Sequence, residues 1–242
     1  MVFDTVMRNP ITQPCCPHRP VGAMEPIERY ALPERFFNCL ATVLIIFIAA
    51  MGAAKAAEPV RLLALGDSLT AGYGLPVEDG FTHRLEARLR AEGFAVTVLN
   101  AGVSGDTSAG GRARLAWSLS DKPTHAIIEL GANDGLRGLD PDAMRSNLEA
   151  IVTRLKAAGV RILLTGMQAP PNYGRLYEEA YNRVYPELAK KHGVLLYPFF
   201  LAGVVTRPDL NQRDGIHPNR NGVTVIVDRI TPYVVRLLKD RE

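Results

Sequence analysis

A serine, a histidine and an aspartate stand where a hydrolytic site would need them. Ser68 lies in the segment Gly66-Asp67-Ser68-Leu69, directly after the apolar run 60–65, and Asp214 and His217 lie three residues apart near the end of the chain. A serine hydroxyl is a weak nucleophile until a base takes its proton. Histidine can do this near neutral pH, and an aspartate that accepts the other ring N–H fixes the tautomer. These residue types predict Ser68 as nucleophile, His217 as base and Asp214 as the orienting acid.

Two further positions offer hydrogen-bond donors for a tetrahedral oxyanion. Asn133 carries a side-chain amide, and Gly105 lies in a loop where the absence of a side chain lets its backbone N–H approach a ligand closely. Removing one such donor typically costs about 10²–10³ in rate. The predicted oxyanion hole therefore consists of Ser68, through its backbone amide, Gly105 and Asn133.

Each of these segments also has a simpler interpretation. Gly, Asp, Asn and Ser are typical of turns, so Gly66-Asp67-Ser68 and Asn133-Asp134 are also what a plain turn after a strand would contain. The segment Asp214 to Pro218 is equally compatible with a turn before a helix. Which interpretation holds depends on the elements that position the residues.

Strand-like and helix-like patterns alternate from residue 60 onward. Apolar runs with the length of buried strands occur at 60–65, 94–99, 124–130, 160–165 and 194–196. Amphipathic helices are predicted from Phe81 to Gly93, from Asp140-Pro141 to Gly159, over 175–192 with a disturbance at Pro186, and over 219–238. Continuously apolar strands separated by such helices predict an α/β fold in three layers: a doubly wound parallel five-stranded sheet with helices on both faces.

The polar segments follow the carboxyl ends of the predicted strands. Ser68 follows the first strand, Gly105 lies in the loop after the second, Asn133 follows the third, and Asp214 and His217 precede the last helix. Ligand sites of open parallel sheets lie beyond this edge. The joint placement favours a functional site over separate turns.

Composition sets few restrictions on the class of protein. Of the 242 residues, 47% are hydrophobic and 22% charged, with 28 basic against 25 acidic side chains. This balance is ordinary for a globular domain and predicts no nucleic-acid partner and no electrostatic attraction to an anionic membrane.

The N-terminal segment is typical of an export signal. The uncharged apolar run 39–54 follows Arg35 and leads into Ala54-Lys55-Ala56, which predicts a secretory signal peptide cleaved after Ala56. The domains expected are an N-terminal extension with signal peptide over 1–56 and a single hydrolase domain over 57–242. The alternative is an uncleaved membrane anchor at 39–54, and Met1 and Met24 both remain possible start positions.

Cysteine and histidine placement predicts a site without metal or cofactor. All three cysteines, Cys15, Cys16 and Cys39, precede the predicted cleavage point, which leaves no thiol nucleophile, disulfide or cysteine metal ligand in residues 57–242. The remaining histidines have no metal-ligand spacing and are expected to be solvated or structural. They are His83, His125 and His192.

The motifs resemble the blocks of the GDSL, or SGNH, hydrolase superfamily. The resemblance places the catalytic serine of the first block at Ser68, the glycine of the second at Gly105, the asparagine of the third at Asn133, and the Asp-x-x-His of the fifth at Asp214 and His217. It covers roughly residues 60–238 and implies the flavodoxin-like fold of that superfamily. The segments 131–138, 172–174 and 214–220 are similar to bacterial periplasmic multifunctional esterases of the thioesterase I, protease I, lysophospholipase and arylesterase type. Ala132 replaces the second glycine usual in their third block.

The resemblance implies a serine esterase or thioesterase with a small acyl ester or thioester as substrate, and the protein is expected to be a monomer. Aryl esters, acyl-CoA and lysophospholipids are the expected classes, with an acyl pocket or lid formed by 136–139 and by Pro170, Pro171 and Tyr173. The protein is expected to be periplasmic or secreted, with no stable membrane span after signal cleavage. Alternatives left open are a carbohydrate O-deacetylase with the same triad and a non-catalytic binding protein on this fold.

Overall fold

The structure, a computed structural model, describes residues 59–240, which lie within the unit Ala57–Glu242 of the chain. The strands are β1 (Val60–Gly66), β2 (Val96–Gly102), β3 (His125–Glu129), β4 (Arg161–Thr165) and β5 (Leu195–Tyr197). They form one sheet in the order β2-β1-β3-β4-β5, and every neighbouring pair is parallel. The predicted fold class is therefore confirmed. The predicted extension and signal peptide, 1–56, lie outside the described residues.

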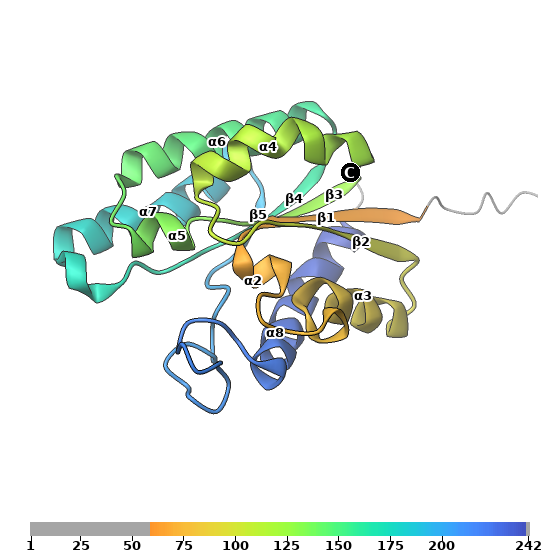
Figure 1. The fold of residues 1–242 in the computed structure, drawn as a ribbon. Helices are drawn as coiled ribbons and strands as arrows, with labels where there is room; N and C mark the ends of the chain where they lie inside the picture. The colour runs from red at the N-terminus through yellow and green to blue at the C-terminus, as the bar shows by residue number, and fades with distance from the viewer. Residues whose placement is uncertain (1–58, 241–242) are drawn as a thin grey trace, which may run out of the picture. The chain divides into compact units, whose positions relative to one another are not determined.

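Helices cover both faces of the sheet (Figure 1). Their bounds are α2 (Ser68–Ala71), α3 (Phe81–Ala91), α4 (Ser108–Ser118), α5 (Ala132–Leu136), α6 (Pro141–Ala157), α7 (Arg175–His192) and α8 (Arg220–Lys239). Single 3₁₀ turns occur at Val77–Asp79, Leu119–Asp121 and Pro171–Tyr173. On one face α4, α6 and α7 pack side by side, and on the other α3 packs against α8. The short helices α2 and α5 begin where β1 and β3 end, at the edge that the sequence predicts for the site.

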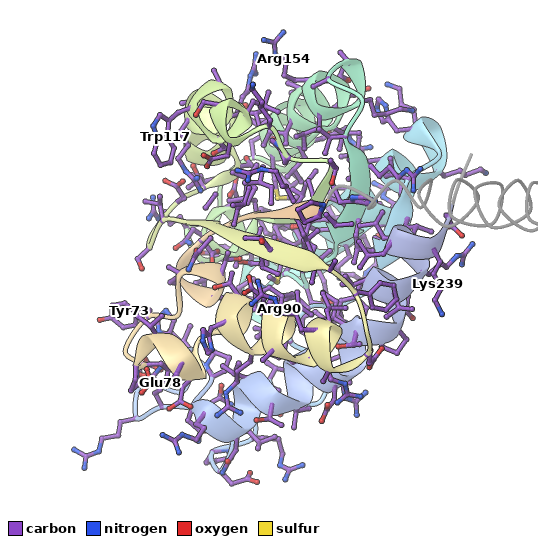
Figure 2. The ribbon with its side chains drawn as sticks, turned by 90° about the vertical axis from the view of Figure 1, so that its right-hand side faces the viewer. Tyr73, Glu78, Arg90, Trp117, Arg154 and Lys239 are labelled. Carbon is purple, nitrogen blue, oxygen red and sulfur yellow. The ribbon has the colours of Figure 1, made fainter. Side chains whose placement is uncertain are left out.

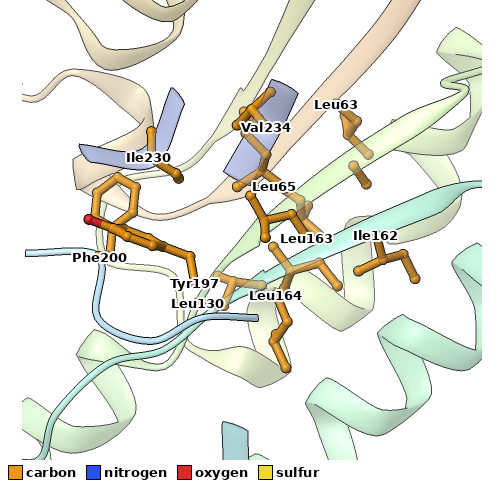
Figure 3. Close-up of a cluster of buried hydrophobic side chains, with 14 of the residues drawn as sticks. Leu63, Leu65, Leu130, Ile162, Leu163, Leu164, Tyr197, Phe200, Ile230 and Val234 are labelled. Carbon is orange, nitrogen blue, oxygen red and sulfur yellow. The ribbon is translucent and has the colours of Figure 1, made fainter. Parts of the chain in front are cut away.

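The core lies between the sheet and the two helix layers. Leu65 of β1, Leu163 of β4 and Val234 of α8 belong to one buried cluster, with the ring of Phe200 at its side (Figure 3). The apolar runs of the inner strands are needed because both faces of the sheet are covered. Burying apolar surface stabilises by about 25 cal/mol per Å², so these strands form the rigid base from which the site loops project.

Local signals account for the long helices. Asp140 caps α6 by accepting from the backbone N–H of Asp142, with Pro141 in the first position, as predicted. The disturbance predicted at Pro186 is wrong, because α7 runs through this residue without interruption. Proline removes one helical N–H, but the buried side chains of Tyr185 and Leu188 on either side hold the helix against the core.

One helix and the end of one strand were not predicted. The α4 sequence SAGGRARLAWS contains two glycines, each of which lowers helix propensity by about 1 kcal/mol. A Cβ on Gly111 would collide with the Leu130 side chain, so α4 needs glycine to approach the sheet. Its buried stripe includes Ser108 and Ser118, so no apolar periodicity marks it. The strand β2 begins at Val96 and continues to Gly102, through residues assigned from sequence to a loop.

Candidate active site

Ser68 lies at the start of α2, one residue beyond the end of β1. Asp67 caps this short helix, with its Oδ1 accepting from the backbone N–H of Leu69 at 3.0 Å. The turn is tight because a Cβ on Gly66 would collide with the side chains of Thr70 and Glu129. The first N–H groups of a helix have no intrahelical acceptor, so the Ser68 amide is available to a ligand.

The structure brings the three residues predicted for nucleophilic chemistry together. His217 Nε2 lies 2.9 Å from Ser68 Oγ, and His217 Nδ1 lies 2.7 Å from Asp214 Oδ2. The chain separation between Ser68 and His217 is 149 residues. This chain of two hydrogen bonds has the geometry in which a base can take the serine proton.

Backbone hydrogen bonds hold Asp214 in place. Its Oδ1 accepts from the backbone N–H groups of Ile216 at 2.9 Å and of His217 at 3.0 Å. These bonds lower the pKa of Asp214 to about 2, with the backbone N–H of His217 as the largest cause and the His217 ring next. A carboxylate that stays ionised over the whole physiological range can keep the imidazole in one tautomer.

A tyrosine that sequence reasoning missed stacks on the histidine. The ring centroids of Tyr73 and His217 are 4.6 Å apart, with the planes inclined at 38°. Tyr73 lies in the loop after α2 and is about half exposed (Figure 2). Gln212 Nε2 donates to the Tyr73 carbonyl and to that of Pro218, which joins this loop to the loop of His217. Unlike Ser68, Tyr73 belongs to no motif used in the sequence analysis, so nothing there paired it with His217.

The proposed oxyanion donors lie on the neighbouring loops. Asn133 Nδ2, in α5, donates to Asp67 Oδ2 at 3.1 Å and to the carbonyl of Asp106 at 3.0 Å. Both amide hydrogens therefore have partners, and one of them binds the residue that precedes Ser68. Gly105 lies in the turn after β2, where Arg137 donates to its carbonyl at 2.8 Å.

Buried polar residues connect these loops to the sheet. Arg114 of α4 binds Asp106 Oδ2 at 2.6 Å and the Gly66 carbonyl at 2.8 Å, which joins the turn of Gly105 to the end of β1. Asp134 accepts from the backbone N–H of Ser108 at 2.7 Å and from its hydroxyl, so it anchors the start of α4. The unpredicted α4 is thus part of what positions the site.

Glu129 is a second residue that sequence reasoning missed. It is the last residue of β3 and has no exposed surface. Burial raises its pKa well above 4.5, and the neighbouring charge of Asp67 raises it further. The same desolvation raises the pKa of Asp67 to about 6. A charged residue within the apolar run 124–130 was the available signal.

A cavity of about 460 Å³ opens beside Ser68 and His217. Its lining is mostly apolar and includes Leu136, Met167, Ala169, Pro170, Pro171, Phe199, Leu201, Val205 and Ile216. Leu136, Pro170 and Pro171 were expected to form an acyl pocket or lid, and they line this cavity. Tyr173 does not line it but donates from its hydroxyl to the Leu136 carbonyl at 2.9 Å.

The other histidines lie away from the site. His192 contacts Glu149 Oε1 at 3.1 Å, and His125 is buried at the start of β3, where desolvation lowers its pKa to about 4. His83 is on the exposed side of α3. Within residues 59–240 no group of three or more His, Cys, Asp or Glu side chains could hold a metal ion. In the same range no helix is both long and apolar enough to cross a membrane.

The fold and the site define a class of protein: a doubly wound α/β domain with serine, histidine and aspartate joined at the carboxyl edge of its sheet. Residues 64–225 match the model of the GDSL-like lipase/acylhydrolase family. The chain is 42% identical to "Esterase TesA" of Pseudomonas aeruginosa over 202 residues, which covers 83% of this chain and 96% of that protein. It is 42% identical over 175 residues to "Thioesterase 1/protease 1/lysophospholipase L1" of Escherichia coli K12, covering 72% and 83% of the two chains.

A solved structure shows the same fold. The esterase EstA from Pseudoalteromonas sp., in a crystal structure inhibited by monoethylphosphonate, superposes with a TM-score of 0.71 at 36% identity, covering 74% of this chain and 99% of that one. The chain belongs to the GDSL-like lipase/acylhydrolase family, as its motifs predict, and is a hydrolase that acts on ester bonds.

Proposed function

We propose that this hydrolase cleaves carboxylic esters and acyl thioesters through a Ser68–His217–Asp214 triad. The hydrogen-bond chain from Ser68 Oγ to His217 Nε2 at 2.9 Å, and from His217 Nδ1 to Asp214 Oδ2 at 2.7 Å, is the observation that carries this proposal. All three groups come from one chain, so the site needs no second copy of the protein.

In the proposed reaction, Ser68 Oγ attacks the acyl carbon while His217 Nε2 takes the hydroxyl proton. The tetrahedral intermediate then collapses, His217 returns the proton to the leaving alcohol or thiol, and an acyl-serine ester remains. Water attacks this ester, His217 takes a proton from it, and the carboxylic acid leaves as Ser68 is restored. Asp214 stays ionised throughout and stabilises the imidazolium that forms twice per cycle.

The negative charge of each intermediate is assigned to donors from Ser68, Gly105 and Asn133. Asn133 Nδ2 already donates to Asp67 and to the Asp106 carbonyl. It must therefore share one of these hydrogen atoms with the oxyanion in a three-centre bond. Asp67 and Asp106 orient the amide before substrate arrives, which is the kind of preorganisation that makes such donors effective.

The apolar lining of the cavity supports an acyl chain as its occupant. The side chains of Phe199, Leu201 and Val205 cannot hydrogen-bond the hydroxyl groups of a sugar, and the volume of about 460 Å³ exceeds what an acetyl group needs. The names of the two relatives, an esterase and a thioesterase/lysophospholipase, favour the same substrate classes. We assign aryl esters, acyl-CoA and lysophospholipids to this site, ahead of acetylated carbohydrates.

A fluorophosphonate probe and a series of chromogenic acyl esters test this proposal. The probe is expected to add one phosphonyl group, mapped to Ser68 by peptide mass spectrometry. Between acetate and medium-chain esters, kcat/KM is expected to rise about threefold to fourfold for each methylene that enters the cavity. A preference for acetylated glycan over longer esters would instead indicate a deacetylase. Absence of both labelling and turnover would indicate a binding protein.

We further propose that the enzyme acts outside the cytoplasm, after cleavage behind Ala56. The support is the sequence of the apolar run 39–54 and the Ala54-Lys55-Ala56 site, which lie outside the described residues. Expressed from the full reading frame in a Gram-negative host, the protein is expected in the periplasmic fraction with Ala57 at its N-terminus. Intact-mass measurement checks this, and recovery of the uncleaved chain from membranes would favour an anchor.

A further inference from the structure

One buried carboxyl group accepts hydrogen bonds from residues on both sides of Ser68, a backbone N–H before it and a side-chain hydroxyl after it. Glu129 pairs in register with Gly66, at the point where β1 ends. Its Oε2 accepts from Thr70 Oγ1 at 2.7 Å and from the backbone N–H of Asp67 at 3.3 Å. Ser68 lies between these two residues, so a single oxygen atom restrains the nucleophile turn before and after the serine.

The same carboxyl group acts indirectly on Asn133. Asp67 Oδ2 accepts from Asn133 Nδ2 at 3.1 Å, while its Oδ1 caps α2. The position of Asp67 therefore sets both the start of the helix that carries Ser68 and the orientation of the Asn133 amide. Glu129 holds Asp67 through its backbone.

The surroundings of Glu129 favour a neutral carboxyl group. Its Oε1 is buried and has no hydrogen-bond partner among residues 59–240, and no lysine or arginine in that range binds either oxygen. An ionised carboxylate left unpaired beside a second carboxyl group would be strongly destabilising. Each oxygen of Asp67 accepts a hydrogen bond, from the Leu69 backbone N–H and from Asn133, whereas Glu129 Oε1 accepts none, so the proton is assigned to Glu129. Burial raises the pKa of Glu129 well above 4.5, in the direction that this assignment needs.

We propose that Glu129, in its protonated form, is a positioning residue that fixes the Ser68 turn and, through Asp67, the Asn133 amide. It touches neither substrate nor a reacting atom. The inference rests on the proposed function, because it assigns to one buried group the alignment of the nucleophile and of one oxyanion donor.

The test compares Glu129→Gln, Glu129→Ala and Thr70→Val with the wild type. Glutamine keeps the neutral charge and the accepting oxygen, so its rate of phosphonylation by the fluorophosphonate probe is expected to stay within about threefold of wild type. Alanine removes the hydrogen bonds to both Thr70 and Asp67. Its rate of phosphonylation is expected to fall by about 10²-fold, the typical cost of misplacing a reacting group by about 1 Å. Valine removes only the Thr70 bond and should fall between the two.

A matched control separates positioning from stability. Ile151→Ala removes buried atoms from α6, away from the site, and should lower the unfolding temperature while labelling at the wild-type rate. In Glu129→Ala and Thr70→Val the loss is expected in kcat for ester hydrolysis, with KM little changed. If the Glu129→Ala and Thr70→Val variants both fold and are both labelled at the wild-type rate, Glu129 has only a structural role and the inference fails. If wild-type protein itself is not labelled, the proposed function fails instead.

The protonation state has its own readout in the pH dependence of unfolding. Two ionisable groups lie near Glu129, namely Asp67 at the α2 cap and Tyr185 on α7. Further out, the charge of His217 lowers the pKa of Asp67, and Arg114 donates to the carbonyl of Gly66. Because folding raises the pKa of Glu129 above 4.5, its contribution to stability is complete below that pH and is lost as pH rises toward the folded pKa. The unfolding temperature should therefore fall less steeply above pH 4.5 in Glu129→Gln than in wild type. An equal or steeper fall would overturn the protonated assignment.

Discussion

Ser68→Ala is expected to lower kcat/KM for a chromogenic short-chain ester by at least about 10⁴. The alanine has no nucleophile, so only the oxyanion donors and substrate binding remain, and these give about 10³–10⁴ over the uncatalysed reaction. The expected change in the free energy of unfolding is within about 0.5 kcal/mol, because among residues 59–240 the serine hydroxyl bonds only to the His217 ring. Stopped assays at high enzyme concentration, together with thermal unfolding, measure both quantities.

Two comparisons make the Ser68 result specific. Ser146→Ala, at an exposed position on α6, is the matched control and should retain wild-type turnover. The double variant Ser68→Ala/His217→Ala should be no slower than Ser68→Ala alone, because a base without its nucleophile has nothing to activate. Wild-type turnover by Ser68→Ala, or a further large loss in the double variant, would show that the two residues do not act as a unit.

The strands of the sheet could be predicted from the sequence because the signal for each strand lies within the strand itself. The apolar runs that became β1, β3 and β4 are buried on both faces, so nearly every residue in them carries the same signal. The caps of α6 and α8 are likewise encoded within four residues, by Asp140-Pro141 and Asn219. Parallel pairing then follows from the alternation of strands and helices.

What escaped prediction depends on contacts between distant segments. The helix α4 exists because Gly111 lets it approach Leu130, and its buried positions are largely small or polar. In the sequence Glu129 is simply an acidic residue at the end of a strand, and its contact with Thr70 of α2 is visible only in the structure. Tyr73 likewise stacks on a histidine that is far away in the chain. The residue types at 68, 214 and 217 led to the proposed chemistry, whereas the side chains that hold these residues in place became visible only in three dimensions.

The carboxyl groups around Ser68 lie in environments that shift their pKa values in opposite directions. Asp67 and Glu129 are desolvated beneath Ser68, and desolvation raises the pKa of each. Asp214, in contrast, is partly exposed and accepts three hydrogen bonds, so its pKa falls to about 2. Glu129 beneath the serine turn and Asp214 beside His217 are therefore expected in different protonation states, set by environment alone.

Asp214→Asn is expected to lower kcat by about 10²–10⁴, with a modest change in KM. The asparagine oxygen can still accept from the backbone N–H groups of Ile216 and His217, so the loop should keep its shape. The amide group in place of Oδ2 cannot accept from His217 Nδ1. The ring then favours the tautomer with its proton on Nε2, which donates to Ser68 instead of accepting from it.

Asp209→Asn is the control for this variant, because Asp209 is an exposed carboxylate in the same loop that pairs with Arg207. It should retain turnover, since its carbonyl, which accepts from Asn219, is unchanged. Nitrogen chemical shifts of the His217 ring would report the tautomer directly in both variants. Retained kcat in Asp214→Asn together with a shifted tautomer would mean that Asp214 holds the loop without orienting the base. Loss of kcat with the tautomer unchanged would place its effect in the charge that stabilises the imidazolium.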